Sequence, residues 1–148
     1  MPEPGARTLL GFDYGTRKMG VAVGQELTGT SRPLVTLRHI GGGPDWDAVT
    51  RLIEQWRPDG LVVGIPLNMD GTEQPMTAAA RRFARRLADR YRLPVYEADE
   101  RLSSRAAGDF IHEAGAERRR HGVDEVAAHV ILQTYMSGVE SEQRKDEA

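Results

Sequence analysis

Short apolar runs, broken by glycine and polar residues, occupy the first forty residues of the chain, a pattern typical of β-strands. Strands are predicted around Leu9–Phe12, around Met19–Val23 and over residues 32–40. Gly15 and Gly20 supply the flexible backbone that a tight connection between the first two strands needs. Three strands joined by such short connections predict an antiparallel meander.

Longer segments follow in which apolar residues recur three and four positions apart, and these predict helices. Two further strands are expected between them, over residues 60–66 and 94–98. The first of these is an apolar run of the kind that lies centrally in a sheet with both faces covered. The helices are expected over residues 45–57, 76–92, about 104–114, and 123–136. Helical connections of this length allow parallel crossovers for the later strands.

This order of elements predicts an α/β fold with one mixed sheet of five strands. The first three strands are expected to be antiparallel and the later ones parallel, with helices on both faces. A chain of 148 residues is of ordinary size for a single domain. We place that domain over residues 7–137, with a disordered N-terminal tail at 1–6 and a disordered acidic C-terminal tail at 138–148.

Composition narrows the class of protein. The chain is 39% hydrophobic and 28% charged, which is typical of a globular protein, and no run approaches the roughly 18 apolar residues of a membrane span. The N-terminal segment MPEPGAR lacks the apolar core of a secretory signal. The absence of cysteine excludes disulfides, thiolate metal sites and cysteine nucleophiles. We therefore expect a cytoplasmic protein.

The net charge of −2 argues against binding nucleic acid by bulk electrostatics, but the basic residues are unevenly distributed. Six arginines crowd into residues 81–92, where only Asp89 opposes them. A second basic run comprises residues 118–121. Of the 20 basic residues only Lys18 and Lys145 are lysines, a skew that genome composition also explains. The arginine clusters alone therefore identify no partner.

Three carboxylates stand at the ends of predicted elements. Asp13 ends the first strand, Glu100 follows the fifth, and Asp124 opens the last helix. In an open α/β sheet the carboxyl ends of the parallel strands form the ligand-binding edge, so we expect the three side chains to converge there. Converging carboxylates repel one another, and their pKa values rise. A divalent, oxygen-seeking cation such as Mg²⁺ or Mn²⁺ removes this repulsion.

Each acid also has an explanation that needs no metal. Asp13 could accept hydrogen bonds from its own turn. Glu100 could form a surface ion pair with Arg101 or Arg105. Asp124 could favour the positive end of its helix. Taken singly, these explanations are at least as good as a metal site, and the shared sheet edge is what favours the metal.

Four segments of the chain resemble, in this order, the signature blocks of the YqgF/RuvX family: GFDYGTRKMGVAVG, VVGIPLNMDGTEQP, ADERLSS and VDEVAAHVILQTYM. The similarity spans roughly residues 7–137. The family is assigned to Holliday junction resolution and to nuclease action on precursor small-subunit ribosomal RNA. The resemblance implies an RNase H-like fold, which agrees with the predicted element order. It also implies a catalytic trio that falls on Asp13, Glu100 and Asp124.

The chemistry that this resemblance suggests is metal-assisted phosphodiester hydrolysis, with two divalent cations about 4 Å apart. Asp13, anchored in a central strand, is the candidate to bridge them, and Glu100 and Asp124 would complete one coordination shell each. For Arg17 and Lys18 a solvated hairpin is the better explanation, and for the loop donors a surface turn is an equally good one. The candidate contacts to substrate phosphate are Arg17, Lys18, Asn68, Gly71, Thr72, Arg101, Arg118, Arg119 and Arg120.

Two features limit what the resemblance implies. Many nucleases of this fold carry an acid at the end of the fourth strand, where this chain has Gly64-Ile65-Pro66. The family resembled here shares that feature and uses the acid after the fifth strand. Its basic run before the last helix usually contains lysine, and here the run is arginine with His121. Arginine keeps the charge but binds phosphate as a planar fork.

Two other classes of function match parts of the sequence. The segment DYGT also resembles the first phosphate-binding turn of actin-like and sugar-kinase ATPases. Those proteins need a second, duplicated domain, and this chain shows no repeat. A non-catalytic nucleic-acid adaptor could keep the fold without turnover, although all three acids are retained. Precursor rRNA, branched DNA and single-stranded DNA are all candidate substrates, and a homodimer presenting two sites would suit a junction.

Overall fold

The computed structural model describes residues 7–100 and 123–147. The predicted helix over 104–114 and the predicted tail at 1–6 lie outside the described residues. In chain order the elements are β1 (Thr8–Tyr14), β2 (Lys18–Gln25), β3 (Thr30–Arg38), α1 (Trp46–Trp56), β4 (Gly60–Ile65), α2 (Pro75–Tyr91), β5 (Val95–Asp99) and α4 (Val123–Glu147).

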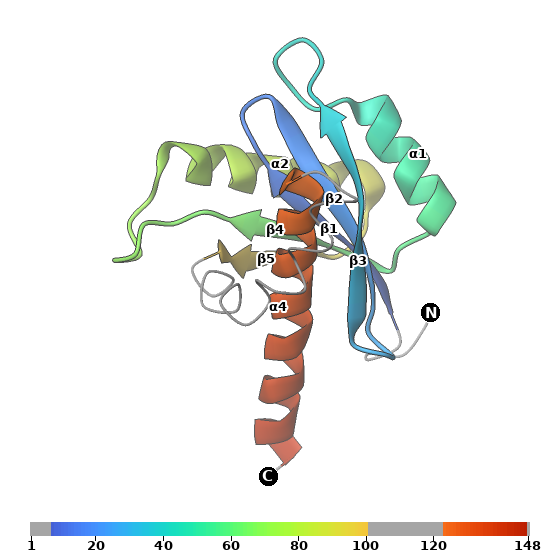
Figure 1. Cartoon of the computed structure of the whole chain (residues 1–148), viewed down its shortest axis with the longest axis vertical. Helices are drawn as coiled ribbons and strands as arrows, with labels where there is room; N and C mark the ends of the chain where they lie inside the picture. Colours follow the sequence, from blue (N-terminus) through green and yellow to red (C-terminus); the bar gives the residue numbers. More distant parts are fainter. Residues whose placement is uncertain (1–6, 101–122, 148) are drawn as a thin grey trace.

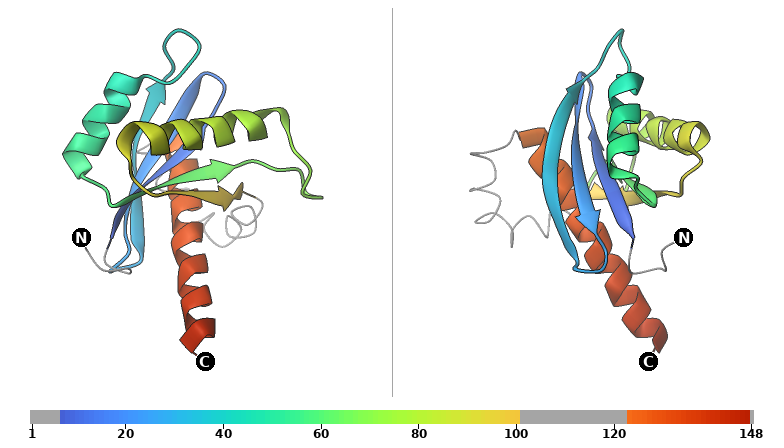
Figure 2. Two further views of the ribbon diagram at one scale, coloured as in Figure 1. Left: turned by 180° about the vertical axis from the view of Figure 1, so that it is seen from behind. Right: turned by 90° about the vertical axis from the view of Figure 1, so that its right-hand side faces the viewer.

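The five strands form one mixed sheet in the order β3-β2-β1-β4-β5. β1, β2 and β3 are antiparallel neighbours, whereas β4 runs parallel to β1 and β5 runs parallel to β4. α1 and α2 cover one face of the sheet and α4 covers the other (Figures 1 and 2). The predicted fold class is therefore confirmed: an α/β fold with a five-stranded mixed sheet and helices on both faces.

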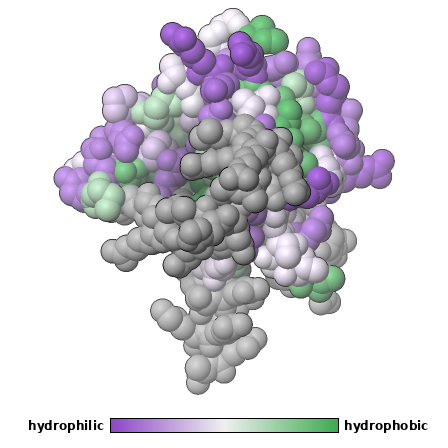
Figure 3. All heavy atoms as spheres, in the orientation of Figure 1, coloured by the Kyte–Doolittle hydropathy of each residue, from purple (hydrophilic) through white to green (hydrophobic). Residues whose placement is uncertain are grey.

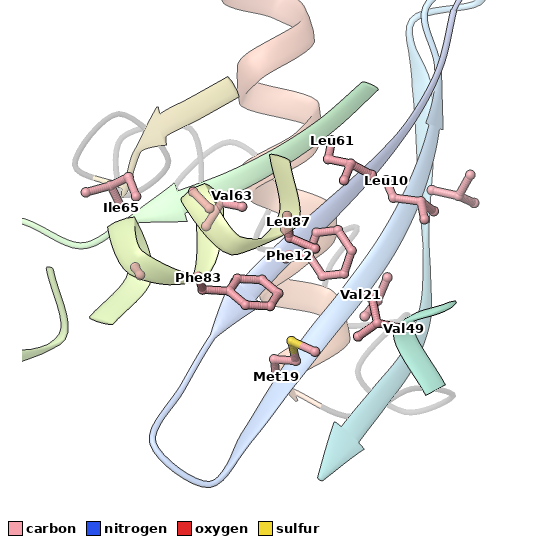
Figure 4. Close-up of a cluster of buried hydrophobic side chains, with 13 residues drawn as sticks. Leu10, Phe12, Met19, Val21, Val49, Leu61, Val63, Ile65, Phe83 and Leu87 are labelled. Carbon is pink, nitrogen blue, oxygen red and sulfur yellow. The ribbon is translucent and has the colours of Figure 1, made fainter. Parts of the chain in front are cut away.

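The larger hydrophobic core lies between the sheet and the helices α1 and α2 (Figure 4). Leu10 and Phe12 of β1 and Val63 of β4 meet Phe83 and Leu87 of α2 there, and all five side chains are buried. The rings of Phe12 and Phe83 pack edge to face with their centroids 5.6 Å apart, a favoured geometry for aromatic pairs. This core fixes β1 rigidly in the centre of the molecule.

A smaller core lies under α4, where Ala128 and Leu132 pack on Leu9 of β1 and Val62 of β4. Because side chains alternate along a strand, the residues of β1 that face α4 are the odd-numbered ones. The same face of β1 therefore leads from the apolar core at Leu9 to a carboxylate at Asp13, near the end of the strand.

α4 is longer than the sequence pattern predicted. We expected the helix to end at Met136 and an acidic tail to follow, but the helix continues to Glu147. The residues after Met136 include no proline that would interrupt the helix. No described helix, α4 included, is long and apolar enough to cross a membrane.

Candidate functional site

The predicted acids lie at the edge of the sheet where β1, β4 and β5 end. Asp13 is the penultimate residue of β1, and Glu100 directly follows β5. Asp124 lies in the first turn of α4. The side chain of Glu100 hydrogen-bonds to Asp13, and the charge of Asp124 acts on Asp13. In the view of Figure 3, hydrophilic side chains predominate over the upper part of the molecule, with hydrophobic ones between them.

Asp13 and Glu100 form a half-buried pair of carboxyl groups. Burial raises the pKa of Glu100 to about 7, and the charges of Asp13 and Asp99 contribute to the rise. Burial also raises the pKa of Asp13, the charge of Asp124 adds to this rise, and the hydrogen bond with Glu100 opposes it. A hydrogen bond between two carboxyl groups needs one proton, so Glu100 donates to the Asp13 carboxylate. A bound cation would take the place of this proton between the two carboxyl groups.

Asp124 has a different partner within the site. Its Oδ2 lies 3.0 Å from the Nζ of Lys18, at the start of β2. The structure therefore places Lys18 beside the acids, while Arg17 is exposed in the preceding turn. Asp124 also lies in the first turn of α4, where the helix dipole favours a negative charge, so the explanation without a metal holds for it as well.

Arg38 is a cation at this edge that sequence reasoning missed. It is the last residue of β3 and pairs with Lys18 in the sheet. Directly opposed residues on antiparallel strands point to the same face, and two like charges in such positions destabilise the pairing unless an anion lies near them. Asp124 supplies that anion for Lys18. The sequence feature that could have indicated this cation is the position of Arg38 near the end of the third predicted strand.

Two glycines make room for the acids. Gly20 pairs with Asp13 in the sheet, and a Cβ at Gly20 would lie 1.8 Å from the carbonyl oxygen of Asp124. A Cβ at Gly64, near the end of β4, would lie 2.8 Å from the Oε1 of Glu100. Gly20 thus lets the start of α4 rest on β2, and Gly64 leaves space for Glu100. Gly64 lies where many nucleases of this fold carry an acid, and here Glu100 occupies that space.

The role that we predicted for Gly20 is wrong. Gly20 is a buried residue inside β2 and takes no part in the turn. Gly15 does lie in the connection between β1 and β2, where its N–H donates to the carbonyl oxygen of Lys18 at 2.9 Å. A Cβ at Gly15 would lie 2.7 Å from the same oxygen. The tight turn between β1 and β2 therefore depends on Gly15 and not on Gly20.

His39, which sequence reasoning also missed, holds this turn in place. Its backbone N–H donates to the carbonyl oxygen of Arg17 at 2.8 Å. Its Nε2 lies 2.8 Å from the carbonyl oxygen of Gly15, which assigns the proton to Nε2 because a carbonyl can only accept. The ring packs against Tyr14 with centroids 5.0 Å apart. His39 therefore fixes the segment that presents Lys18 to the acids.

The loop between β4 and α2, which contains the predicted phosphate-binding residues Asn68, Gly71 and Thr72, is braced from within. The Nδ2 of Asn68 donates to the Oγ1 of Thr72 at 2.9 Å, and this hydroxyl donates to Asp70 at 2.6 Å. Gly71 adopts a φ of 89°, which favours glycine. These side chains are used inside the loop, which supports its interpretation as a surface turn.

The remaining predicted contacts to phosphate lie outside the described residues: Arg101, Arg118, Arg119 and Arg120.

Asp13, Glu100 and Asp124 supply the kind of ligand that the expected Mg²⁺ or Mn²⁺ would need. Among residues 7–100 and 123–147, no three His, Cys, Asp or Glu side chains are gathered closely enough to bind a metal ion. Asp13 and Glu100 are in contact, but Asp124 is tied to Lys18. Carboxylate oxygens are the ligands that these cations prefer, and an uncompensated acidic pair suits them. The pair therefore fits a cation, with Asp124 joining it on release from Lys18.

The sequence has close relatives among known proteins. Residues 7–138 match the family model RuvX, described as Holliday junction resolvase. A protein of Nitrosococcus oceani named "Putative pre-16S rRNA nuclease" is 51% identical over 138 residues, which cover 92% of this chain and 91% of that protein. An Escherichia coli protein of the same name is 49% identical over 130 residues, 86% of this chain and 94% of its own length.

Solved structures share the fold at low sequence identity. The RuvC protein of T. thermophilus, in complex with a Holliday junction substrate, has a TM-score of 0.58 at 19% identity, covering 90% of this chain and 96% of its own. The fowlpox virus resolvase has a TM-score of 0.54 at 10% identity, covering 89% and 98%. These likenesses establish the fold alone, which is RNase H-like. With that fold and a family match over residues 7–138, the chain belongs to the RuvX family.

Proposed function

We propose that this chain is a metal-dependent nuclease that hydrolyses phosphodiester bonds in structured nucleic acid. Its substrates would be the 5′ end of pre-16S rRNA, Holliday junctions, or both, as the names of its relatives and of its family suggest. The observation that carries this proposal is the contact between Asp13 and Glu100, two half-buried carboxyl groups with raised pKa values and with Asp124 beside them. They lie at the edge of the sheet where ligands of α/β proteins bind.

Asp13, Glu100 and Asp124 would hold two Mg²⁺ or Mn²⁺ ions, which when bound activate water and neutralise charge at the phosphate. Asp13 is the rigid member of this set because β1 is paired on both sides. Glu100 keeps a proton between the two carboxyl groups while no cation is bound, and loss of that proton frees both groups as ligands. Asp124 would join this set on release from Lys18, whose side chain is 54% exposed.

Basic side chains at the rim of the site would bind the phosphates on either side of the cleaved bond. Lys18 and Arg38 are opposed in the sheet beside Asp124, so a phosphate between them would relieve their repulsion. That the loop donors of residues 68–72 bind phosphate stays a prediction. The domain boundaries 7–137, the homodimer and the cytoplasmic location also stay predictions. The other cations proposed for phosphate contact are Arg17, Arg101, Arg118, Arg119 and Arg120.

The proposed nuclease activity is tested with Asp13→Asn, assayed with Mg²⁺ and with Mn²⁺ on a four-way DNA junction, single-stranded DNA and a pre-16S rRNA fragment. We expect the fold to persist and cleavage to fall by more than the roughly 10- to 100-fold typical of losing an outer-shell partner, because the variant replaces a ligand itself. Asp47→Asn, in an exposed acid of α1, is the matched control and should cleave normally.

Two outcomes would contradict the proposed activity. Wild-type cleavage by Asp13→Asn would make Asp13 a turn residue. A wild-type chain that binds these nucleic acids and cleaves none of them would be a non-catalytic adaptor, the alternative that the sequence left open.

A further inference from the structure

The face of the sheet opposite the acids carries a row of arginines along α2. Arg81 is neutralised by Glu73 at 2.6 Å and by Glu97 at 3.4 Å. Among the described residues, none of the other arginines of α2 forms an ion pair, and Asp89 is the single acid in the helix. These unpaired and exposed arginines are Arg82, Arg85, Arg86 and Arg90.

Two of these arginines are held on one aromatic ring. The Cζ of Arg86 lies 5.1 Å, and that of Arg90 4.6 Å, from the ring centroid of Trp46 at the start of α1. Trp46 is held in turn by Phe83 and Tyr91, with ring centroids 5.8 and 6.3 Å away. A guanidinium group over a ring keeps N–H donors at its edge. Both groups are thus positioned in advance and remain able to bind an anion.

The spacing extends this pair into a row. Arg82, Arg86 and Arg90 follow one another at four-residue intervals, which places them on one side of the helix at steps of about 6 Å. Like charges at this spacing repel one another, and an anion lying along the row would remove the repulsion. We call these three residues the α2 arginine row.

The helix that carries the row begins near the acidic edge of the sheet. The hydroxyl of Thr77, in the first turn of α2, hydrogen-bonds to the carbonyl oxygen of Pro66, directly after β4. Thr16, in the turn after Asp13, contacts Met76 at 3.5 Å. From there α2 runs back along the sheet (Figure 2). A strand that crosses the acidic edge can therefore continue along the row.

We propose that the α2 arginine row binds the phosphodiester backbone of a nucleic-acid strand, in a part of the substrate beyond the bond that is cleaved. This inference rests on the proposed function for the identity of its ligand. A row of unpaired guanidinium groups matches a row of phosphates, whereas a protein partner would need an apolar centre. The large hydrophobic side chains that the described residues expose lie in loops outside α1 and α2: Leu27, Ile40 and Met69.

The first test uses the fluorescence of Trp46. The chain contains two tryptophans, so Trp56→Phe leaves Trp46 as the reporter, and Asp13→Asn prevents cleavage during the titration. A single-stranded RNA of about 20 nucleotides, longer than the roughly 4–16 nucleotides that single-strand-binding folds cover, is the probe. We expect a saturable change in Trp46 emission, and its loss when Arg86→Gln and Arg90→Gln are added.

The second test is the salt dependence of RNA binding, measured by anisotropy of the labelled RNA. Loss of two phosphate contacts should reduce the slope of log K against log salt concentration by about 1.4. Arg32→Gln is the matched control, because Arg32 lies 5.1 Å over the other tryptophan, Trp56, and should leave the slope unchanged. The variant with Arg86→Lys and Arg90→Lys keeps the charge and should retain the slope, with weaker binding.

Three outcomes would overturn the assignment: an unchanged slope in the double glutamine variant, shown by its melting curve to be folded; an equal emission change with poly-glutamate, which would indicate an acidic protein; or an equal change with inorganic phosphate. Failure of the proposed nuclease function is separate from these. A wild-type chain that binds RNA through the row and cleaves no substrate would overturn the nuclease assignment and support the row.

Discussion

Glu100 keeps its proton to an unusually high pH for a carboxylic acid, and this couples folding to pH. Its pKa is raised from 4.5 to about 7 in the folded chain. The folded state therefore binds the proton more tightly than the unfolded state, so the associated stability is fully present below pH 4.5 and is lost as the pH rises through 7. Without metal, we expect this loss to be on the order of 1–2 kcal/mol of unfolding free energy, reduced by solvent screening.

Denaturant titrations across this pH range, in the presence of a chelator, measure the loss. Glu100→Gln is the control, because its neutral amide cannot gain the buried charge. The wild type should therefore lose stability relative to Glu100→Gln as the pH rises. Parallel curves for the two proteins would show that the carboxyl pair does not share a proton.

Lys18 occupies a position next to Asp124 that a metal ion would also favour, so its removal should change metal affinity. The Nζ of Lys18 lies 3.0 Å from Asp124, and both side chains are partly exposed. Lys18→Gln should therefore alter stability by less than about 1 kcal/mol. It should also lower the Mn²⁺ concentration that gives half of the full thermal stabilisation, because Asp124 is free to bind the ion. Arg17→Gln should leave this midpoint unchanged, and a midpoint at higher Mn²⁺ would contradict the competition.

At the scale of the elements, the contact between α4 and β2 depends on the missing side chain of Gly20. A Cβ there would lie 1.8 Å from the backbone of Asp124, so Gly20→Ala must displace the start of α4. We expect a loss of roughly 1–3 kcal/mol from overpacking, together with loss of cleavage. Gly138→Ala is the matched control, because a Cβ at Gly138 would meet nothing within 4 Å.

In a helix, alanine is favoured over glycine by up to about 1 kcal/mol, so Gly138→Ala should stabilise the chain. Thermal unfolding and cleavage assays of both variants distinguish the two effects. Equal melting temperatures would mean that α4 does not rest on β2 as described.

The strands and helices could be predicted from sequence because their signals are local: apolar runs, helical spacing, and breakers such as Pro58. The approach of Glu100 to Asp13 could also be predicted, because it follows from the common edge of the parallel strands β1, β4 and β5. The role of Gly20 and the pairing of Lys18 with Asp124 could not. Both depend on how α4 packs on β2. This packing is a contact between residues about 100 positions apart in the chain, and no local sequence pattern predicts it.

At the scale of the whole molecule, the chain presents different chemistry on the two faces of one sheet. The α4 face leads to the acids, and the opposite face carries the α2 arginine row. The two faces meet at the edge of the sheet where β4 ends, because the first turn of α2 is hydrogen-bonded to the residue that follows β4. A substrate longer than the reach of the acids would therefore contact both faces of the sheet.

The binding of metal to the whole folded chain separates a nuclease from a kinase-like protein. Only the folded state brings Asp13, Glu100 and Asp124 to one edge of the sheet. Mg²⁺ or Mn²⁺ should therefore raise the melting temperature, by the equivalent of about 2.7 kcal/mol at a concentration 100 times the Kd. The gain should shrink on acidification, because protons on the Asp13 and Glu100 pair compete with metal. It should vanish in the double variant Asp13→Asn, Asp124→Asn. ATP added with the metal should cause no further shift, because kinase-like proteins close a second domain over the nucleotide and the described residues form a single sheet. A large shift with ATP and none with metal alone would overturn the nuclease in favour of the kinase-like alternative.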